Sequence, residues 1–188
     1  IYTTTDTLSL HDALPISQYG GMLAMSFPDK IEKYVSYGQM HIDSPDIARR
    51  RHKLEIFQKT PYVIIPEEQW KPRFYSMTPE DTNDPAVIEC FARAAATVEK
   101  KTPTGPQIDM INKMPMLNPR LIQVPTMIIH GVHDDVADIE GLAPFFRLLP
   151  NAYKRYVVVP EGGHMLHLQK GHLLFQHEVA SFLKIPVI

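Results

Sequence analysis

Carboxylate and histidine side chains follow two apolar segments of this chain at the point where each segment ends. His133, Asp134 and Asp135 come after "VPTMIIHG", and His164 comes after "RYVVVPEGG". A carboxylate that faces a histidine fixes the tautomer of the imidazole and stabilises the imidazolium that forms when the ring takes up a proton. Such a pair is the orienting half of a nucleophilic triad, so these residues indicate acid–base chemistry between the two segments.

The two segments are expected to be neighbouring strands of a parallel sheet. "PTMIIHG" is a continuous apolar run that ends at glycine, as is typical of a strand buried on both faces, and "KRYVVVPEGGH" predicts a second buried strand. "EGLAPFFRLLP" between them and "LLFQHEVASFLK" after them predict helices, which indicates α/β architecture. Because reactive groups in such sheets gather beyond the carboxyl ends of the strands, we expect the two polar loops to be neighbours.

Further elements are expected earlier in the chain. "GGMLAMSFPDKIEK" predicts a short apolar helix that ends near Phe27 and Pro28, and "IEKYVSYGQMH" predicts a short strand that ends at Gly38. "SPDIARRRHKLEIFQ" predicts a helix with Ser44 as its N-cap and Pro45 in its first position. "DPAVIECFARAAATVEKK" predicts an amphipathic helix. Its apolar side is expected to hold Val87, Ile88, Phe91, Ala94, Ala95 and Val98.

The composition describes one soluble globular domain and excludes several classes of partner. A hydrophobic content of 44% and a net charge of −2 give no electrostatic preference for nucleic acid or an anionic membrane, and no apolar run is long enough to span a bilayer. Cys90 is the only cysteine, which excludes an internal disulfide and fits a cytoplasmic protein. His167, His172 and His177 have helix-like spacing, but no carboxylate or cysteine joins them at ligand spacing, so we expect no metal.

Taken together, three segments resemble the α/β-hydrolase superfamily. "VPTMIIHGVHDD" resembles its acid-bearing strand and loop, and "VVVPEGGHMLHLQ" resembles its histidine loop. "YGGMLAMSFPDKIEKYVSYG" is similar to the helix and strand that follow the nucleophile elbow, G-x-S-x-G-G. The resemblance covers the chain from about Gln18, apart from its middle, and implies the C-terminal part of an α/β-hydrolase parallel sheet.

The resemblance also implies the roles of two site residues. It places the acid on Asp134, with Asp135 as the alternative; the aspartate that is not the acid would serve as a turn or cap residue. It makes His164 the general base and then the general acid of the reaction.

The nucleophile departs from the family pattern. The serine of G-x-S-x-G-G stands two residues before the first glycine of the final pair, and counting back from Gly20 reaches Gln18. Three interpretations stay open: a lengthened elbow that uses Ser17, a natural glutamine in the nucleophile position, or an error at a junction.

The first residues do not continue the pattern of a hydrolase. Leu8–Ile16 can be encoded as CTT TCC CTA CAC GAC GCT CTT CCG ATC, which resembles a widely used sequencing-library adapter. We therefore interpret residues 1–16 as adapter-derived and non-native. On this interpretation the chain is a fragment from a metagenomic or other library, without the family's first strands and one of its two oxyanion-hole donors.

The middle of the chain stands where this superfamily commonly inserts a helical lid. We expect residues 17–43 and 120–188 to form the core and residues 44–119 to form the lid. The apolar lid residues either line an acyl or aromatic pocket or pack the lid onto the core: Phe57, Tyr62, Ile64, Ile65, Trp70, Phe74 and Tyr75. The "RRRHK" run from Arg49 is expected to be a solvated helix face, with a contact to an anionic substrate as the alternative.

The function that the resemblance implies is that of a lidded serine hydrolase without a cofactor. Its full-length parent would cleave a carboxylic ester, lactone or related acyl bond of a small molecule, whereas the chain by itself is expected to be inactive. A proline iminopeptidase-like or carbon–carbon-bond hydrolase is the alternative among enzymes. A non-catalytic binding protein of the hydrolase fold, with Gln18 in the nucleophile position, is the alternative from another class.

Overall fold

The computed structural model describes residues 16–40, 45–75, 78–98, 101–137 and 139–186. Three of its strands form a parallel sheet in the order β1 (Tyr34–Tyr37), β4 (Thr126–Gly131) and β5 (Lys154–Val159). Thr126 pairs with Tyr34 on one side and with Lys154 on the other, so the three strands start level. The predicted parallel sheet is therefore confirmed, with β4 between its two neighbours.

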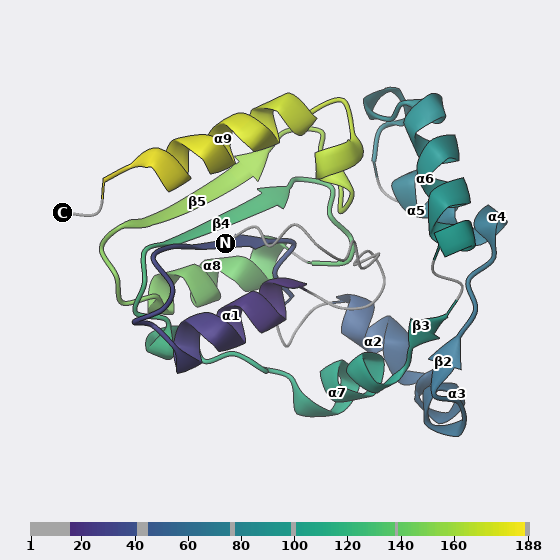
Figure 1. Ribbon diagram of the computed structural model, residues 1–188, viewed down its shortest axis with the longest axis horizontal. Coiled ribbons are helices and arrows are strands. Elements are labelled where there is room, and N and C mark those ends of the chain that lie inside the picture. The colour runs from purple at the N-terminus through teal and green to yellow at the C-terminus, as the bar shows by residue number, and fades with distance from the viewer. Residues whose placement is uncertain (1–15, 41–44, 76–77, 99–100, 138, 187–188) are drawn as a thin grey trace.

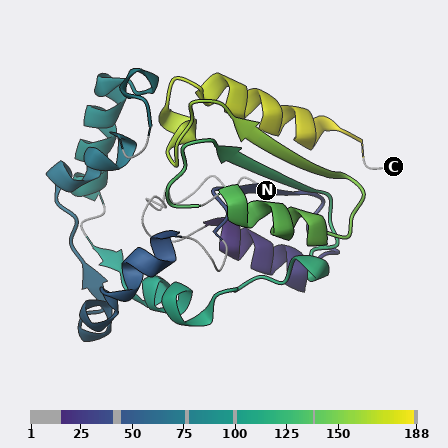
Figure 2. The ribbon, with the colours of Figure 1, turned by 180° about the vertical axis from the view of Figure 1, so that it is seen from behind.

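Helices cover both faces of this sheet (Figure 1, Figure 2). On one face lie α1 (Ile16–Ser26) and α8 (Ile139–Leu148), and on the other lies α9 (His172–Lys184). Side chains of β4 alternate between the two layers, since Ile128 packs with residues of α1 and α8 while Met127 and Ile129 pack with residues of α9. All six residues of β4 are buried, which confirms the prediction of a strand covered on both faces.

The prediction that β5 is equally buried is wrong. Only Val159 of this strand is fully buried, and Val158 is 39% exposed. The cause is its place in the sheet, because β5 pairs with β4 alone and forms an edge of the described sheet. Its apolar run instead reflects contacts with both helical layers, through Tyr156 on one face and Val157 on the other.

The middle of the chain folds into short elements beyond the carboxyl ends of β4 and β5 (Figure 1). Their bounds are α2 (Pro45–Arg51), α3 (Leu54–Lys59), β2 (Tyr62–Val63), α4 (Glu67–Trp70), α5 (Pro72–Tyr75), η1 (Glu80–Thr82), α6 (Pro85–Val98), β3 (Thr102–Pro103) and α7 (Gly105–Lys113). The chain then returns to the other end of the sheet, where η2 (Pro119–Leu121) contacts α8 just before β4 begins. β2 and β3 pair antiparallel, so the segment that connects them starts and ends at neighbouring residues, Val63 and Thr102.

Two helix predictions for this segment need correction. The helix expected from Ser44 onward is two helices, α2 and α3, because the Lys53 amide donates to the Arg50 carbonyl in a turn and both helices then contact α7. Ser44 itself lies outside the described residues. Helix α6 is confirmed, but its buried side includes Ala92 while Ala94 is exposed.

The middle segment contacts both polar loops of the core. Ile47 and Met110 pack with Ala137 of the loop after β4. Phe74 and Ile88 pack with Met165, which follows β5. In the part of the chain that the structure describes, no helix has the length and apolar character needed to cross a membrane.

The loops after β4 and β5 touch through their backbones. The Val132 amide donates to the Val159 carbonyl at 3.1 Å, and the His133 amide donates to the Gly162 carbonyl at 2.8 Å. A Cβ atom on Gly131 would lie 2.4 Å from the Gly162 oxygen, closer than a carbon atom can approach a carbonyl. Glycine at the end of β4 is therefore required for the two loops to meet.

We predict that Gly131→Ala lowers the free energy of unfolding by about 1–3 kcal/mol, because the added methyl group must push one backbone away from the other. Gly105→Ala is the matched control, since a Cβ atom there meets no atom within 4 Å. The control should change stability by less than about 0.5 kcal/mol. Denaturant unfolding of both variants measures this, and equal effects would contradict the proposed close contact.

Candidate active site

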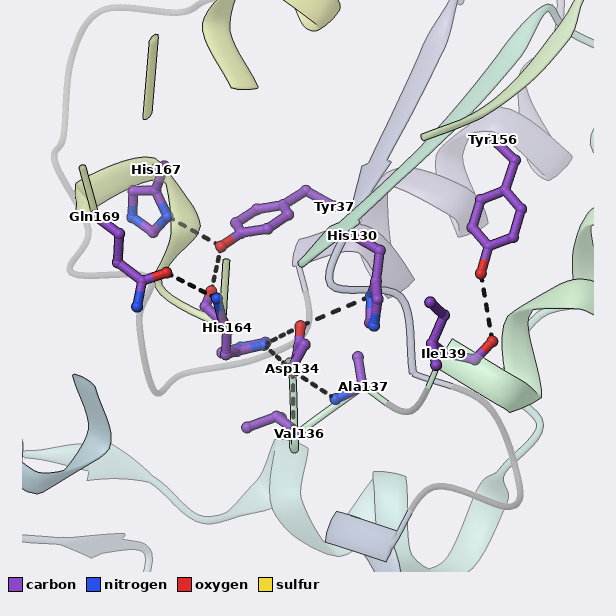
Figure 3. A network of polar contacts seen from close by, with 11 residues as sticks. Tyr37, His130, Asp134, Val136, Ala137, Ile139, Tyr156, His164, His167 and Gln169 are labelled. Atoms are coloured by element: carbon purple, nitrogen blue, oxygen red, sulfur yellow. Dashed lines mark hydrogen bonds and ion pairs between the residues drawn. The ribbon is translucent and has the colours of Figure 1, made fainter. Parts of the chain in front are cut away.

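The structure brings Asp134 and His164 together at the carboxyl ends of β4 and β5. His164 Nδ1 lies 3.1 Å from Asp134 Oδ1 and 3.0 Å from Asp134 Oδ2 (Figure 3). The Asp134 side chain is fully buried, whereas the His164 side chain is 31% exposed. This geometry places the buried carboxylate behind the ring and leaves the ring accessible from outside, as an acid–base pair requires.

The loop around Asp134 holds its carboxylate ionised. Oδ1 accepts hydrogen bonds from the amides of Val136 and Ala137, both at 2.9 Å. Burial by itself would raise the pKa of Asp134, but the charge and hydrogen bond of His164, together with His130 and the Ala137 amide, hold the pKa below its usual value. These hydrogen bonds distinguish Asp134 from Asp135, which is half-buried in the same loop.

Tyr37, the last residue of β1, and Gly38, which follows it, also contact His164. The Tyr37 ring stacks on the His164 ring, with centroids 6.3 Å apart and an interplanar angle of 20°, and Tyr37 Oη donates to the His164 carbonyl (Figure 3). Gly38 has φ +60°, and a Cβ atom there would lie 3.0 Å from His164 Cε1. Burial, with the Asp134 charge, raises the pKa of Tyr37 well above its usual value, so the hydroxyl stays a donor. The sequence analysis predicted only strand-forming and strand-ending roles for these two residues.

The histidine loop is also tied to the middle segment through Gln169. Its Oε1 accepts from the Gly163 amide at 2.8 Å, and its Nε2 donates to Asn83 Oδ1 at 3.0 Å. The Lys170 amide donates to the Thr82 carbonyl at 2.9 Å. Sequence reasoning missed this role, although Gln169 ends the "VVVPEGGHMLHLQ" segment that carries the family resemblance.

The structure does not join Ser17 to the pair. Ser17 lies at the start of α1, is 6% exposed, and its Oγ makes no hydrogen bond to a described residue. Its carbonyl accepts from Tyr34 Oη. Gln18 is 1% exposed and its Nε2 donates to the Met40 carbonyl at 2.7 Å. Both residues are therefore buried against β1 and the loop that follows it.

Other candidate residues have separate positions. Among the described residues, no group of three or more His, Cys, Asp or Glu side chains is arranged to hold a metal ion. His167 Nδ1 lies 3.4 Å from Tyr37 Oη, His172 Nδ1 lies 2.8 Å from the Gln169 carbonyl, and His177 is exposed.

The apolar residues of the middle segment divide by burial. Phe57, Trp70 and Phe74 are buried, whereas Tyr62, Ile64 and Tyr75 are exposed and Ile65 is half-buried. In the basic run, the Arg51, His52 and Lys53 side chains are exposed, which supports the solvated-face interpretation; Arg50 donates to Gln107, and the Arg49 side chain is not described.

Comparison with known proteins identifies the family. The family model for the alpha/beta hydrolase fold matches residues 2–171, and the chain belongs to this family. No curated protein matches the sequence. The interpretation of residues 1–16 as adapter-derived stays a prediction, because residues 1–15 lie outside the described part of the chain.

Solved structures show the same fold at low identity. The chain is similar to a thermophilic esterase from Thermogutta terrifontis, with 20% identity, a TM-score of 0.63 and 89% of this chain covered. It is similar to monoglyceride lipase from Saccharomyces cerevisiae, with 17% identity, a TM-score of 0.65 and 89% of this chain covered. It is also similar to 2-hydroxy-6-oxo-6-phenylhexa-2,4-dienoate hydrolase from Rhodococcus, with 14% identity, a TM-score of 0.58 and 90% of this chain covered. The chain spans 61% of the length of each of these three structures.

We predict that Asp134→Asn lowers the free energy of unfolding by about 2 kcal/mol near neutral pH, because the charged hydrogen bond to His164 is lost. The folded-state pKa of Asp134 is depressed, so the ionised carboxylate stabilises the fold above about pH 4, the usual value for an unfolded Asp. That stabilisation disappears as the pH falls through the lower folded pKa. The stability difference between wild type and variant should therefore shrink below about pH 4.

Asp135→Asn is the control for this prediction, because the hydrogen bonds to His164, Val136 and Ala137 belong to Asp134. Denaturant unfolding of the three proteins from pH 3 to pH 7 provides the measurement. A larger and more pH-dependent loss in the Asp135 variant would reverse the assignment within this loop.

Proposed function

We propose that the protein to which this chain belongs hydrolyses a carboxylic ester, lactone or related acyl compound through a nucleophile, His164 and Asp134. The observation that carries the proposal is the contact of His164 Nδ1 with both oxygens of a buried, ionised Asp134. This contact fixes the proton on Nδ1 and leaves Nε2 as the basic nitrogen. A half-exposed imidazole in this tautomer is suited to take a proton from a hydroxyl nucleophile.

The proposed reaction has two stages. A hydroxyl oxygen attacks the carbonyl carbon of the substrate while His164 accepts its proton, and Asp134 stabilises the imidazolium. When the tetrahedral intermediate collapses, His164 gives the proton to the departing alcohol and an acyl-enzyme remains. Water then attacks the acyl group while His164 accepts its proton. When this second tetrahedral intermediate collapses, the bond between the acyl carbon and the nucleophile's oxygen breaks, His164 returns the proton to that oxygen, and the carboxylic acid is released.

The start of α1 is the proposed place of the nucleophile. Gln18 occupies the position that carries serine in the family pattern, and Ser17 is the neighbouring hydroxyl. Both lie in the first turn of an α-helix, where free backbone amides favour the negative charge that develops on an attacked carbonyl oxygen. Gln18 has no hydroxyl group, and the buried Ser17 Oγ makes no hydrogen bond to His164. We therefore propose that this chain reacts poorly with acyl substrates.

We predict that a fluorophosphonate probe leaves the wild-type chain largely unlabelled and labels Gln18→Ser at least 10-fold faster. The reason is that the new hydroxyl stands where the family places its nucleophile. Labelling of Gln18→Ser should fall by at least 10-fold when His164→Ala is added, and Ser17→Ala should not reduce it. Mass spectrometry of the labelled peptide measures both outcomes.

Two results would change the account in different ways. Labelling of wild type at Ser17 that His164→Ala abolishes would make Ser17 the nucleophile and this chain active. Labelling of Gln18→Ser that His164→Ala leaves unchanged would contradict the proposed acid–base role of His164.

We further propose that residues 44–119 act as a lid over this site. The segment contacts the loop after β4 through Met110 and the loop after β5 through Phe74 and Asn83. A substrate entering at the exposed side of His164 would therefore meet side chains of this segment.

We predict that replacing residues 64–101 by an Asn-Gly turn changes acyl-chain selectivity more than it changes folding of the sheet. The design uses the antiparallel pair Val63–Thr102, whose two strands a two-residue turn can join. In the Gln18→Ser background, the ratio of labelling rates for short and long alkyl phosphonates should shift by at least 3-fold. Loss of the folded state with an unchanged ratio would make the segment part of the scaffold.

A non-catalytic binding role is the second candidate, and the hydrogen bond of Gln18 to Met40 favours it. In this role the site beside His164 would hold an acyl compound without reacting with it. The sequence of the full-length gene separates the two, because serine in place of Gln18 would support the enzyme, whereas glutamine with no nearby serine would support the binding protein.

A further inference from the structure

His130 is a buried histidine that the proposed reaction does not use. It lies in β4, one residue before Gly131, and its side chain has no exposed area. Its Nδ1 lies 3.8 Å from Asp134 Oδ2, on the opposite side of the carboxylate from His164 (Figure 3). Asp134 therefore stands between two imidazoles, one buried and one accessible.

The groups around the two oxygens of Asp134 show how a second imidazole can affect its contact with His164. A carboxylate has about four lone-pair sites. Oδ1 accepts from the amides of Val136 and Ala137 and also lies near His164. Oδ2 has His164 at 3.0 Å and His130 at 3.8 Å. His130 thus faces the oxygen that carries the shorter contact with the reacting histidine.

We propose that His130 is a positioning residue for the acid–base pair. Its Nδ1–H points toward Asp134 Oδ2 across 3.8 Å, a charge–dipole contact that is longer than a hydrogen bond. This contact draws part of the carboxylate's negative charge away from His164 and so makes His164 a weaker base. Only the catalytic consequence of this arrangement rests on the proposed function. The effect on His164 is a property of the folded chain. Because all three groups lie in or beside the protein interior, their interaction is screened less than a surface pair would be.

Titratable groups from three elements act at this carboxylate. His164 comes from the loop after β5, His130 from β4, and Tyr37 from β1, where the Asp134 charge adds to burial in raising the pKa of the phenol. Burial opposes ionisation of Asp134, while His164 and then His130 favour it and lower its pKa. Removal of His130 would leave His164 as the main balancing charge.

We test this with the 188-residue chain by following the imidazole signals of His164 in an NMR pH titration. His130→Leu removes the donor and keeps a side chain of similar volume, whereas His130→Asn is smaller and keeps an N–H near the place of Nδ1. We expect His130→Leu to raise the pKa of His164 by about half a unit or more. His130→Asn should stay closer to wild type than to His130→Leu.

The matched control is Thr126→Val. Thr126 is fully buried on the same side of β4 as His130, four residues earlier, and its hydroxyl donates to the Val124 carbonyl. This variant loses a buried polar group without touching Asp134, so the pKa of His164 should not change. A purely structural role of His130 would loosen the loop and lower the pKa of His164, opposite to the proposed direction.

The inference is overturned if His130→Leu leaves the pKa of His164 unchanged or lowers it, or if the Leu and Asn variants shift it equally. If the Leu variant does not fold, the tautomer of His130 in the wild-type chain tests the inference instead. Long-range ¹H–¹⁵N spectra showing the proton on Nδ1 support the inference, and a proton on Nε2 alone overturns it. Neither readout requires turnover, so a lack of His164-dependent labelling in Gln18→Ser would contradict the proposed function and leave this test intact.

Discussion

The backbone contact between the ends of β4 and β5 is the constraint on which the candidate site depends. Gly131 approaches the Gly162 carbonyl more closely than a residue with a Cβ atom could, and the His133 amide bonds to the same carbonyl. This contact fixes the separation of the two loops. Asp134 and His164 then meet without either side chain having to reach across open solvent.

Because Asp134 is buried, the interactions that its carboxylate makes depend on one another. An ionised carboxylate in the interior is stable only with hydrogen bonds and a compensating charge, and removal of one partner leaves the others uncompensated. The partners come from separate parts of the chain: two amides from its own loop, His164 from the loop after β5, and His130 from β4. Tyr37 and Gly38 of the β1 end then confine the His164 ring, so all three strands contribute to one geometry.

Much of this arrangement could be predicted because local pattern encodes it. The "PTMIIHG" run predicted a buried strand, and chain order with strand–helix alternation predicted that the Asp134 and His164 loops are neighbours. The exposure of Val158 could not be predicted, because an apolar run does not reveal whether a strand has a neighbour on both sides. The link from Gln169 to Asn83 depends on how distant segments pack, which no local period records.

The nucleophile shows a different limit of sequence reasoning. Counting along the motif distinguishes Ser17 from Gln18 by one position, but both side chains are buried at the start of α1 and neither is hydrogen-bonded to His164. His130 was predicted only as a strand residue, since its relation to Asp134 arises from the turn that brings residue 134 back over the strand end. In both cases the deciding information is the direction of a side chain.

The central claim is that Asp134 and His164 form one acid–base unit, and the proton between them tests it most directly. A low-temperature ¹H spectrum of the 188-residue chain should show a strongly downfield Nδ1 proton of His164. Asp134→Asn should remove this signal, whereas Asp135→Asn should keep it. Absence of the signal in wild type, or its loss in the Asp135 variant instead, would contradict the account.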